Sequence, residues 1–482
     1  MGFIHQQEGC DGLSRTSATD KCIDIRFLMR KKILILNDRF PIRDVLINLG
    51  DRAMVSGLYR TVEESLGYEI VSGGCKNFPY YNIRRYKKEK TRNNVESVFG
   101  NWFEETTRIT RQSVQTGKKI SDFLDTNILF QNRLFQQFEE KVKARFSRGL
   151  METFKPFLLK KYYAYQFIEK IKSVDCVLFN GTAIVADRFD FYLPAHLFEC
   201  YLAKRLGKKV FTINQSIDIE NPLNAEMVSH IYRNLDLHLT REPLSKNALL
   251  RLGVEEAKLI SSCDAAFAAD YQTTIQASQL REKEGLRKNA VVLVIRGDRN
   301  VDFETWARII DHLEKVRGKK VFLAFTCITQ DEHVYNELAK RCNLVRLSRF
   351  YDYKELTLLL ESFDYLISDR YHALIFAIHA KIPVIPINPA FNTIKTEGLF
   401  CLFDYPVNVM PPVEKETYDH VMLSIEYVEE HNHELKEILA KASVDIKNKL
   451  AEDIKEISRK MRDTNGTLEQ ATSSFLPYDE ST

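Results

Sequence analysis

The strongest chemical signal in the chain is the segment SDRYHALIFAIHAKIPVIPI, which runs from Ser368 to Ile387. Apolar residues before it predict a strand, and the apolar run after His372 predicts a buried helix with Arg370 and His372 at its first turn. A helix N-terminus carries free N–H groups and partial positive charge, so these two side chains favour a phosphate or carboxylate ligand. A surface arginine beside a capping histidine is the alternative, which the apolar helix disfavours because burial directs its N-terminus towards an interdomain cleft.

Alternating strand and helix patterns surround this segment. KILIL at residues 32–36 predicts a strand, NLGD at 48–51 a loop before a helix, and residues 68–71 a second strand. The alternation resumes at residue 175, and AVVLVIRGD from residue 290 begins a second series. Such alternation is typical of parallel sheets. We therefore expect an α/β fold with two Rossmann-like, doubly wound domains facing a cleft, in the GT-B-like arrangement.

Changes of pattern also predict the domain boundaries. Both ends of the chain are polar and lack an apolar core, so they are expected to be disordered. The predicted division is a disordered leader at 1–28, an N-terminal Rossmann-like domain at 29–285, a C-terminal Rossmann-like domain with terminal helices at 286–461, and a disordered tail at 462–482.

Residues 81–172 interrupt the alternation of the N-terminal domain. They lack strong strand signals, and runs such as NILFQNRLFQQFEEKVKARF predict several helices. The segment contains 20 Lys and Arg against 10 Asp and Glu, which concentrates the basic charge of the chain there. One interpretation is a solvated helical insert whose aromatic residues pack on the sheet. The other is a surface for an anionic partner, such as a lipid-linked sugar at a membrane face.

The composition excludes several classes of protein. A formal net charge of +3 is too small for non-specific nucleic-acid binding, so no nucleic-acid partner is expected. The longest apolar run, residues 373–387, is broken by His379, Lys381 and two prolines, so no transmembrane helix is expected. Nine cysteines occur singly, without a CxxC pair, which favours reduced thiols and a cytoplasmic location.

The sequence lacks the familiar cofactor motifs. It contains no HExxH, no clustered Asp and His spacing for a metal, no GxxxxGK[ST] phosphate loop, and no GxGxxG after the first strand. We therefore expect a site that uses neither a metal ion nor a nicotinamide.

Five segments, in order, resemble motifs of the polysaccharide pyruvyl transferase family. SDRYHALIFA followed by PVI is similar to the family's closing motif, S-x-R-x-H-x-x-x-F-A. The other four are NLGD with Ala53, similar to N-x-G-D-x-A; INQSID at 213–218, similar to a G-Q-S strand end with Asn214 in place of glycine; TREPLSKNALLRLG at 240–253, similar to R-E-x-x-S-x-x-x-L-x-x-x-G; and DAAF at 264–267, similar to D-x-A-F.

The resemblance implies transfer of the enolpyruvyl unit of phosphoenolpyruvate to two hydroxyls of one sugar in a polysaccharide or its precursor. The product would be a pyruvate ketal, with release of phosphate. Phosphoenolpyruvate is then a substrate, and no cofactor is needed. A lipid-linked acceptor, and peripheral contact of the basic insert with the inner face of the membrane, are compatible with this reaction.

The implied donor carries a carboxylate and a phosphate on one small carbon frame, so several fixed cations should converge on it. Bidentate arginines suit both groups better than lysine. Arg370 and Arg241 are the first donor-binding candidates, and Arg296 is a third because it follows a strand end at the same cleft. Lys395 stands where the family also tends to carry a lysine and is a donor-binding candidate that would face the phosphate, although a solvated lysine is the ordinary expectation.

His372 is the candidate proton donor and, with Arg370, the predicted catalytic pair. Histidine titrates near neutral pH, and its charged form is favoured beside a phosphate. It would protonate either the methylene carbon of the donor or the departing phosphate. Asp51 and Asp264 are candidates for accepting the hydroxyl proton, with helix capping as the alternative role. His379, on the same apolar helix, is expected to be a packed core histidine.

A second group of residues is expected to contact the acceptor or to shape a nearby loop. Asn48, Gly50 and Asp51 predict a loop in which the backbone approaches the ligand, with a positive φ at Gly50. Gln215 and Ser216 close a strand. They are expected to hydrogen-bond the sugar or the donor, or else to satisfy backbone groups at the strand end.

Two features depart from the family pattern and leave other functions open. FNGTA at residues 179–183 stands where a G-G-G-like loop is frequent, and the insert at 81–172 is longer than expected. A two-domain glycosyltransferase that uses a nucleotide sugar would share the architecture, although no acidic motif is placed to hold a donor ribose. A non-catalytic assembly component of polysaccharide synthesis would bind sugar precursors without turnover.

Overall fold

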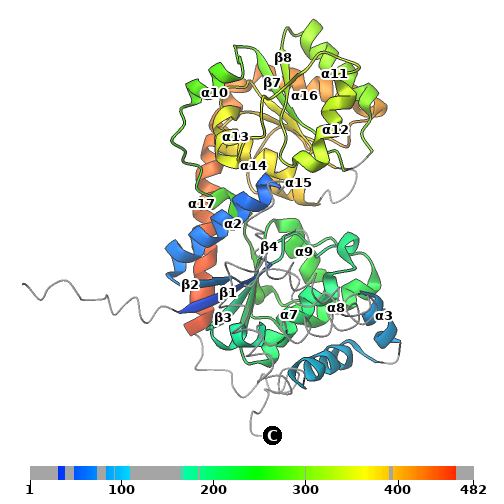
Figure 1. The fold of residues 1–482 in the computed structure, drawn as a ribbon, viewed down its shortest axis with the longest axis vertical. Coiled ribbons are helices and arrows are strands. Elements are labelled where there is room, and N and C mark those ends of the chain that lie inside the picture. Colours follow the sequence, from blue (N-terminus) through cyan, green and yellow to red (C-terminus); the bar gives the residue numbers. More distant parts are fainter. Residues whose placement is uncertain are drawn as a thin grey trace, which may run out of the picture.

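The computed structural model shows two α/β domains stacked along the long axis of the molecule, each built around one parallel sheet (Figure 1). The expected fold class, two Rossmann-like doubly wound domains, is confirmed. The structure describes residues 31–37, 48–72, 83–91, 93–108, 164, 167–182, 185–298, 300–389 and 394–462.

The first sheet belongs to the N-terminal half of the chain. Its strands are parallel and lie in the order β2-β1-β3-β4-β5-β6. Apolar runs form the central strands, as expected where helices cover both faces of a sheet. The bounds are β1 Lys32–Leu36, β2 Glu69–Ser72, β3 Cys176–Asn180, β4 Lys209–Gln215, β5 Leu237–Thr240 and β6 Leu259–Ser261.

The second sheet is also parallel, with the order β11-β10-β7-β8-β9. Its central strand β7 is AVVLV and is buried along its whole length. The bounds are β7 Ala290–Val294, β8 Lys320–Leu323, β9 Val345–Arg346, β10 Leu366–Ser368 and β11 Val384–Pro386. The chain therefore passes from one sheet to the other between β6 and β7.

Helices connect the strands and pack against the sheets (Figure 1). In α11, for example, the Asp302 carboxylate caps the N-terminus by accepting the backbone N–H groups of Glu304 and Thr305. The bounds are α2 Leu49–Thr61, α3 Ile83–Lys90, α7 Leu193–Arg205, α8 Pro222–Tyr232, α9 Pro243–Arg251, α10 Ala277–Lys283, α11 Phe303–Lys315, α12 Ile328–Leu338, α13 Tyr353–Leu360, α14 Tyr371–Ala380, α15 Ile394–Phe400, α16 Tyr418–Glu430 and α17 Asn432–Arg462. None of the helices in the described ranges is long and apolar enough to span a membrane.

Each sheet reverses its strand order at one point. The reversal lies between β1 and β3 in the first sheet and between β7 and β10 in the second. Ligands of open α/β sheets bind outside the carboxyl ends of the strands at such a point. At the first, the Asn37 side chain donates to the Asn180 carbonyl at 2.7 Å. At the second, the Arg296 backbone N–H donates to the Asp369 carboxylate at 2.8 Å.

The described part of the basic insert at 81–172 is helical. It includes α3, a helix over residues 95–108, and helical residues at 164 and 167–172. In the helix over residues 95–108, Trp102 packs against Phe99 and against Phe198 of α7. These aromatic residues belong to the apolar cluster that includes residues of β1 and β3. Residues 109–163 of the insert, the predicted leader at 1–28, and 463–482 of the predicted tail lie outside the described residues, whereas Arg462 is the last residue of α17.

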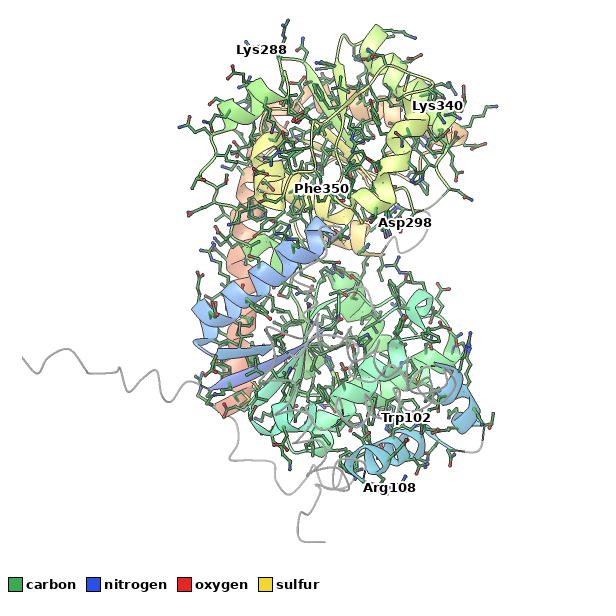
Figure 2. All side chains as sticks on the ribbon, viewed as in Figure 1. Trp102, Arg108, Lys288, Asp298, Lys340 and Phe350 are labelled. Atoms are coloured by element: carbon green, nitrogen blue, oxygen red, sulfur yellow. The ribbon has the colours of Figure 1, made fainter. Side chains whose placement is uncertain are left out.

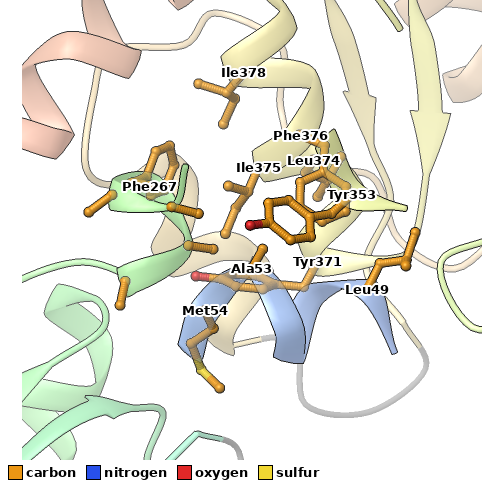
Figure 3. Packing of buried hydrophobic residues seen from close by; sticks show 14 of the residues in the cluster. Leu49, Ala53, Met54, Phe267, Tyr353, Tyr371, Leu374, Ile375, Phe376 and Ile378 are labelled. Atoms are coloured by element: carbon orange, nitrogen blue, oxygen red, sulfur yellow. The ribbon is translucent and has the colours of Figure 1, made fainter. Parts of the chain in front are cut away.

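One apolar cluster joins the two domains. Figure 3 shows Leu49, Ala53 and Met54 of α2 close to Leu374 and Ile375 of α14. The long helix α17 runs beside both domains and adds its own apolar residues to the same cluster (Figure 1). The first turns of α2 and α14 are thereby held next to each other.

Candidate active site

Strand β10 and helix α14 position the segment that the sequence singled out. β10 ends at Ser368, whose hydroxyl donates to the Val294 carbonyl of β7 at 2.8 Å and accepts the Arg370 backbone N–H at 3.0 Å. α14 begins at Tyr371, with Arg370 in the N-cap position but without a side-chain capping bond. Nearly every residue of α14 is buried. Its first turn is therefore fixed at the carboxyl edge of the second sheet.

His372 faces residues of the N-terminal domain. Its Nε2 atom lies 3.7 Å from Oδ2 of Asp264, which is an ion-pair distance and too long for a hydrogen bond. Asp264 follows β6 and caps the short helix η4 (Ala265–Ala268) by accepting the Ala266 N–H. Arg241, directly after β5, donates from Nη1 to the same carboxylate at 2.9 Å. Three strand ends thus contribute one side chain each.

Electrostatics keep the central carboxylate of this group ionised. Burial by itself would raise the pKa of Asp264, but His372, Arg241 and the Ala266 N–H outweigh it and lower the pKa to about 2. An ionised carboxylate can orient the neighbouring imidazole ring and balance the charge of a proton on it. The group can therefore support proton transfer by His372.

Gly50 makes room for the imidazole ring. A Cβ atom at this position would lie 1.8 Å from Nδ1 of His372. Gly50 lies in the first turn of α2 rather than in a loop, and its φ is not positive, so the prediction of a left-handed loop glycine was wrong. The close approach of His372 is the physical reason for a glycine here. Asn48 is the N-cap of α2 and accepts the Gly50 N–H at 2.9 Å, and Asp51 lies in the same turn.

Arg370 is held by neighbours in its own domain. Its Nη2 atom donates to the Asp331 carboxylate and, at 3.0 Å, to the side-chain oxygen of Gln330. Asp331 also accepts the Gly297 backbone N–H at 3.0 Å. The Nε atom of Arg370 is buried and has no hydrogen-bond partner within the described ranges. Arg370 therefore ties β10 to α12, and its Nε donor remains unused.

Arg296 is also paired within its domain. It follows β7, and its Nε and Nη2 atoms each donate to the Asp298 carboxylate at 2.6 Å. Figure 2 shows Asp298 on the side of the C-terminal domain that faces the N-terminal domain. An anionic ligand would have to bind beside this ion pair or replace Asp298 in it.

Gln215 and Ser216, at the end of β4, occupy different environments. The Ser216 hydroxyl donates to Oε2 of Glu242 at 3.2 Å, and the same oxygen lies 3.9 Å from Nε of Arg241. Burial raises the pKa of Glu242 to about 7 despite the lowering influence of Arg241. The Gln215 amide packs against Gly181 and has no hydrogen-bond partner among the described residues. Ser216 is thus connected to Arg241 through Glu242.

Lys395 and Arg241 meet on one aromatic ring. The Nζ atom of Lys395 lies 5.6 Å from the ring centroid of Tyr371, and the guanidinium carbon of Arg241 lies 5.0 Å from it. Both distances are within the range of cation–π contacts. Both cations are buried. A cation from each domain therefore contacts the residue between Arg370 and His372.

Arg188, which the sequence analysis missed, belongs to the same electrostatic environment. It lies in the short helix η2 (Asp187–Phe189) after β3. Burial and the positive charge of Arg296 lower the pKa of Arg188 to about 10, and Arg241 adds to this effect. The lowered pKa of Arg188 thus reflects its burial first and the nearby positive charge of Arg296 second. Arg188 is therefore a further cation at the junction of the two domains.

The charged residues of the site do not line either of the cavities found beside α17. Two cavities of about 420 and 370 Å³ border α17, and neither is lined by His372 or Arg241. In the part of the chain that the structure describes, no three His, Cys, Asp or Glu residues gather closely enough to hold a metal ion. The site is defined instead by the charged side chains at the strand ends.

A family model for polysaccharide pyruvyl transferases matches residues 48–390, which include Gly50, Arg241, Asp264 and His372. The chain belongs to the polysaccharide pyruvyl transferase family. The resemblance inferred from the five sequence segments is thereby confirmed. No curated protein sequence matches this member of the pyruvyl transferase family.

Solved structures similar to this pyruvyl transferase family member include a UDP-GlcNAc 2-epimerase and a glycosyltransferase. The UDP-GlcNAc 2-epimerase from Neisseria meningitidis bound to UDP-GlcNAc is 14% identical, with a TM-score of 0.49 over 89% of this chain and 100% of that chain. A glycosyltransferase from Rickettsia africae is 14% identical, with a TM-score of 0.47 over 90% and 100%. This similarity concerns the fold alone.

Proposed function

We propose that this protein transfers the enolpyruvyl unit of phosphoenolpyruvate to two hydroxyls of one sugar in a polysaccharide or its precursor. The product is a pyruvate ketal, and inorganic phosphate is released. The family supports the reaction class. The cations at the domain junction support a small anionic donor.

The observation that carries this proposal is the convergence of cations from both domains. Arg241 and Lys395 contact the ring of Tyr371. Acidic residues pair with several neighbouring cations, yet the pKa of Arg188 is still lowered, by burial first and then by positive neighbours. Crowded, partly desolvated like charges are unfavourable in the free protein, and a bound anion offsets that cost. Phosphoenolpyruvate brings a carboxylate and a phosphate on one small frame.

His372 is the residue best placed to move the proton. In the proposed reaction, a proton adds to the methylene carbon of the donor, and the neighbouring carbon becomes oxocarbenium-like. One sugar hydroxyl attacks this carbon, and the second hydroxyl then replaces the phosphate. The two protons lost by the hydroxyls balance those gained by the methyl group and the phosphate. Asp264 holds the His372 ring in place for the transfer.

Ligand binding tests the identity of the donor. A ligand that binds only the folded protein raises its unfolding midpoint. Phosphoenolpyruvate is expected to raise the midpoint of the wild-type protein, and Arg241→Met is expected to abolish that shift. Arg308→Met is the matched control, because Arg308 is an exposed arginine that stacks on Tyr418 of α16. A shift by nucleotide sugars, with none by phosphoenolpyruvate, would overturn the proposal.

A further inference from the structure

Tyr371 places a polar group inside the junction between the two domains. It is the first residue of α14, and only 3% of its surface is exposed. Figure 3 shows its ring beside Ala53 of α2, with the hydroxyl on the side of η4. The side chain therefore extends from the C-terminal domain into the group of elements that carries Asp264.

Three buried hydrogen-bond donors lie close together around this ring. The Tyr371 hydroxyl has no hydrogen-bond partner among the described residues, and the same holds for Nε and Nη2 of Arg241. The guanidinium carbon of Arg241 is 5.0 Å from the ring centroid, and the His372 ring is 5.2 Å away. Buried polar groups are normally paired, because leaving them unpaired is costly. The described residues therefore supply no acceptor for these donors, and a bound ligand would offer one.

The charge of the surroundings defines that acceptor. Burial raises the pKa of Tyr371 well above its usual value, and Asp264 and Glu242 raise it further against the opposing influence of Arg241. The phenol therefore stays protonated at neutral pH and can donate its proton to a hydrogen bond. Guanidinium groups are donors only. A protonated phenol beside a cation selects an anionic oxygen, as in a carboxylate or a phosphate.

We propose that the Tyr371 hydroxyl donates a hydrogen bond to an oxyanion of the donor substrate, beside the unused Nε and Nη2 donors of Arg241. This inference rests on the proposed function, which makes phosphoenolpyruvate the donor. Tyr371 is then a substrate-binding residue. The family motif S-x-R-x-H does not specify this position, so the hydroxyl adds a contact that the motif does not describe.

Tyr371→Phe tests the proposal because it removes the hydroxyl and keeps the ring. Tyr353→Phe is the matched control, since Tyr353 of α13 is another buried tyrosine at the junction and its hydroxyl bonds the Ser56 hydroxyl of α2 at 3.1 Å. Figure 3 shows both tyrosines. For each protein we would measure KM and kcat with phosphoenolpyruvate. We would also measure the shift of the unfolding midpoint by phosphoenolpyruvate, pyruvate and inorganic phosphate.

Tyr371→Phe is expected to raise KM for phosphoenolpyruvate about tenfold or more, with a smaller change in kcat. If Tyr371→Phe loses the shift of the unfolding midpoint by pyruvate, the hydrogen bond goes to the carboxylate. If it loses the shift by inorganic phosphate, the hydrogen bond goes to the phosphate. Tyr353→Phe is expected to match the wild type in KM and in every shift. The inference is overturned if Tyr371→Phe has the wild-type KM and keeps the wild-type midpoint shifts with pyruvate and with inorganic phosphate. If the wild-type protein responds to none of these anions, the proposed function fails and the inference fails with it.

Discussion

Nε2 of His372 and Oδ2 of Asp264 lie 3.7 Å apart although they belong to different domains. The histidine is in the first turn of α14, and the aspartate follows β6. Arg241 completes the group by donating to the same carboxylate at 2.9 Å. The packing of the two domains therefore brings together the candidate proton donor and the carboxylate that orients it.

His372→Gln is expected to lower kcat by about 10²–10⁴-fold, which is the usual contribution of a general acid to the rate. The unfolding midpoint should change little, because the imidazole is only partly buried and its Nε2 atom has no hydrogen-bond partner among the described residues. Steady-state kinetics and thermal unfolding of the same preparation measure both quantities.

His379→Ala provides the contrast on the same helix. The His379 ring packs against Tyr271 at a centroid distance of 4.1 Å, lies 3.2 Å from the Ser443 hydroxyl through Nδ1, and has its pKa lowered to about 4 by burial. Its loss should lower the free energy of unfolding by about 2 kcal/mol and leave kcat near the wild-type value. Lost turnover in His379→Ala with normal turnover in His372→Gln would contradict the site assignment.

Gly50→Ala is expected to displace the His372 ring, because the new Cβ would lie 1.8 Å from Nδ1. A catalytic group moved by about 1 Å can cost about 10²-fold in rate. Alanine is the better helix former, so α2 itself should not be weakened. Gly100→Ala is the control, since the nearest atom to its added Cβ is the Tyr201 hydroxyl at 3.7 Å. Normal kinetics in Gly50→Ala would show that the contact is not needed.

Arg188→Gln is expected to raise KM for phosphoenolpyruvate about tenfold while leaving the fold intact. The position of Arg188 is fixed by Asp187, whose carboxylate accepts the backbone N–H groups of Glu220 and Asn221 and the Asn224 amide, each at 2.7 Å. Removing the guanidinium relieves its repulsion with Arg296 and also removes its attraction to Asp218 and Asp298, so the two effects on stability oppose each other. Steady-state kinetics with Arg308→Gln as the control measure the effect. An unchanged KM would place Arg188 outside the donor site.

Glu242→Gln is expected to flatten the pH dependence of stability. The pKa of Glu242 is raised to about 7, first by burial, whereas an unfolded glutamate titrates at about 4.3. Between these values the folded protein keeps a proton that the unfolded chain has lost. The free energy of unfolding therefore falls as the pH rises through this window, by at most ~1.4 kcal/mol per pH unit. Chemical denaturation at several pH values in this window should show a shallower decline of the free energy of unfolding for Glu242→Gln than for the wild type. Parallel plots of this free energy against pH would refute the raised pKa of Glu242.

The architecture was predictable because it follows from local pattern. The apolar runs KILIL and AVVLV mark strands that are buried on both faces, and each is followed by a helix. Glycine is usual in the family at the position of Asn214, whose φ is 58°. Asparagine tolerates the left-handed conformation, so this departure preserves the backbone.

The details of the site were less predictable because they depend on tertiary contacts. Gly50 was interpreted as a loop glycine, but the constraint comes from His372, which is remote in the sequence. Arg188 carries no recognisable motif, and it is positioned by the hydrogen bonds of Asp187 with residues beyond β4. The pairing of Arg370 with Asp331 likewise joins segments that sequence spacing does not relate. The residue types at the strand ends were enough to identify the site, whereas the residues that they contact could be found only in the structure.

Phosphate release from phosphoenolpyruvate by the purified protein is the most direct test of the central claim. Model glycosides and lipid-linked glycosides serve as acceptors, with Arg241→Met and His372→Gln as controls. The proposed function predicts acceptor-dependent release that both variants lose. Release that both variants retain, or turnover of a nucleotide sugar with no release from phosphoenolpyruvate, would contradict it.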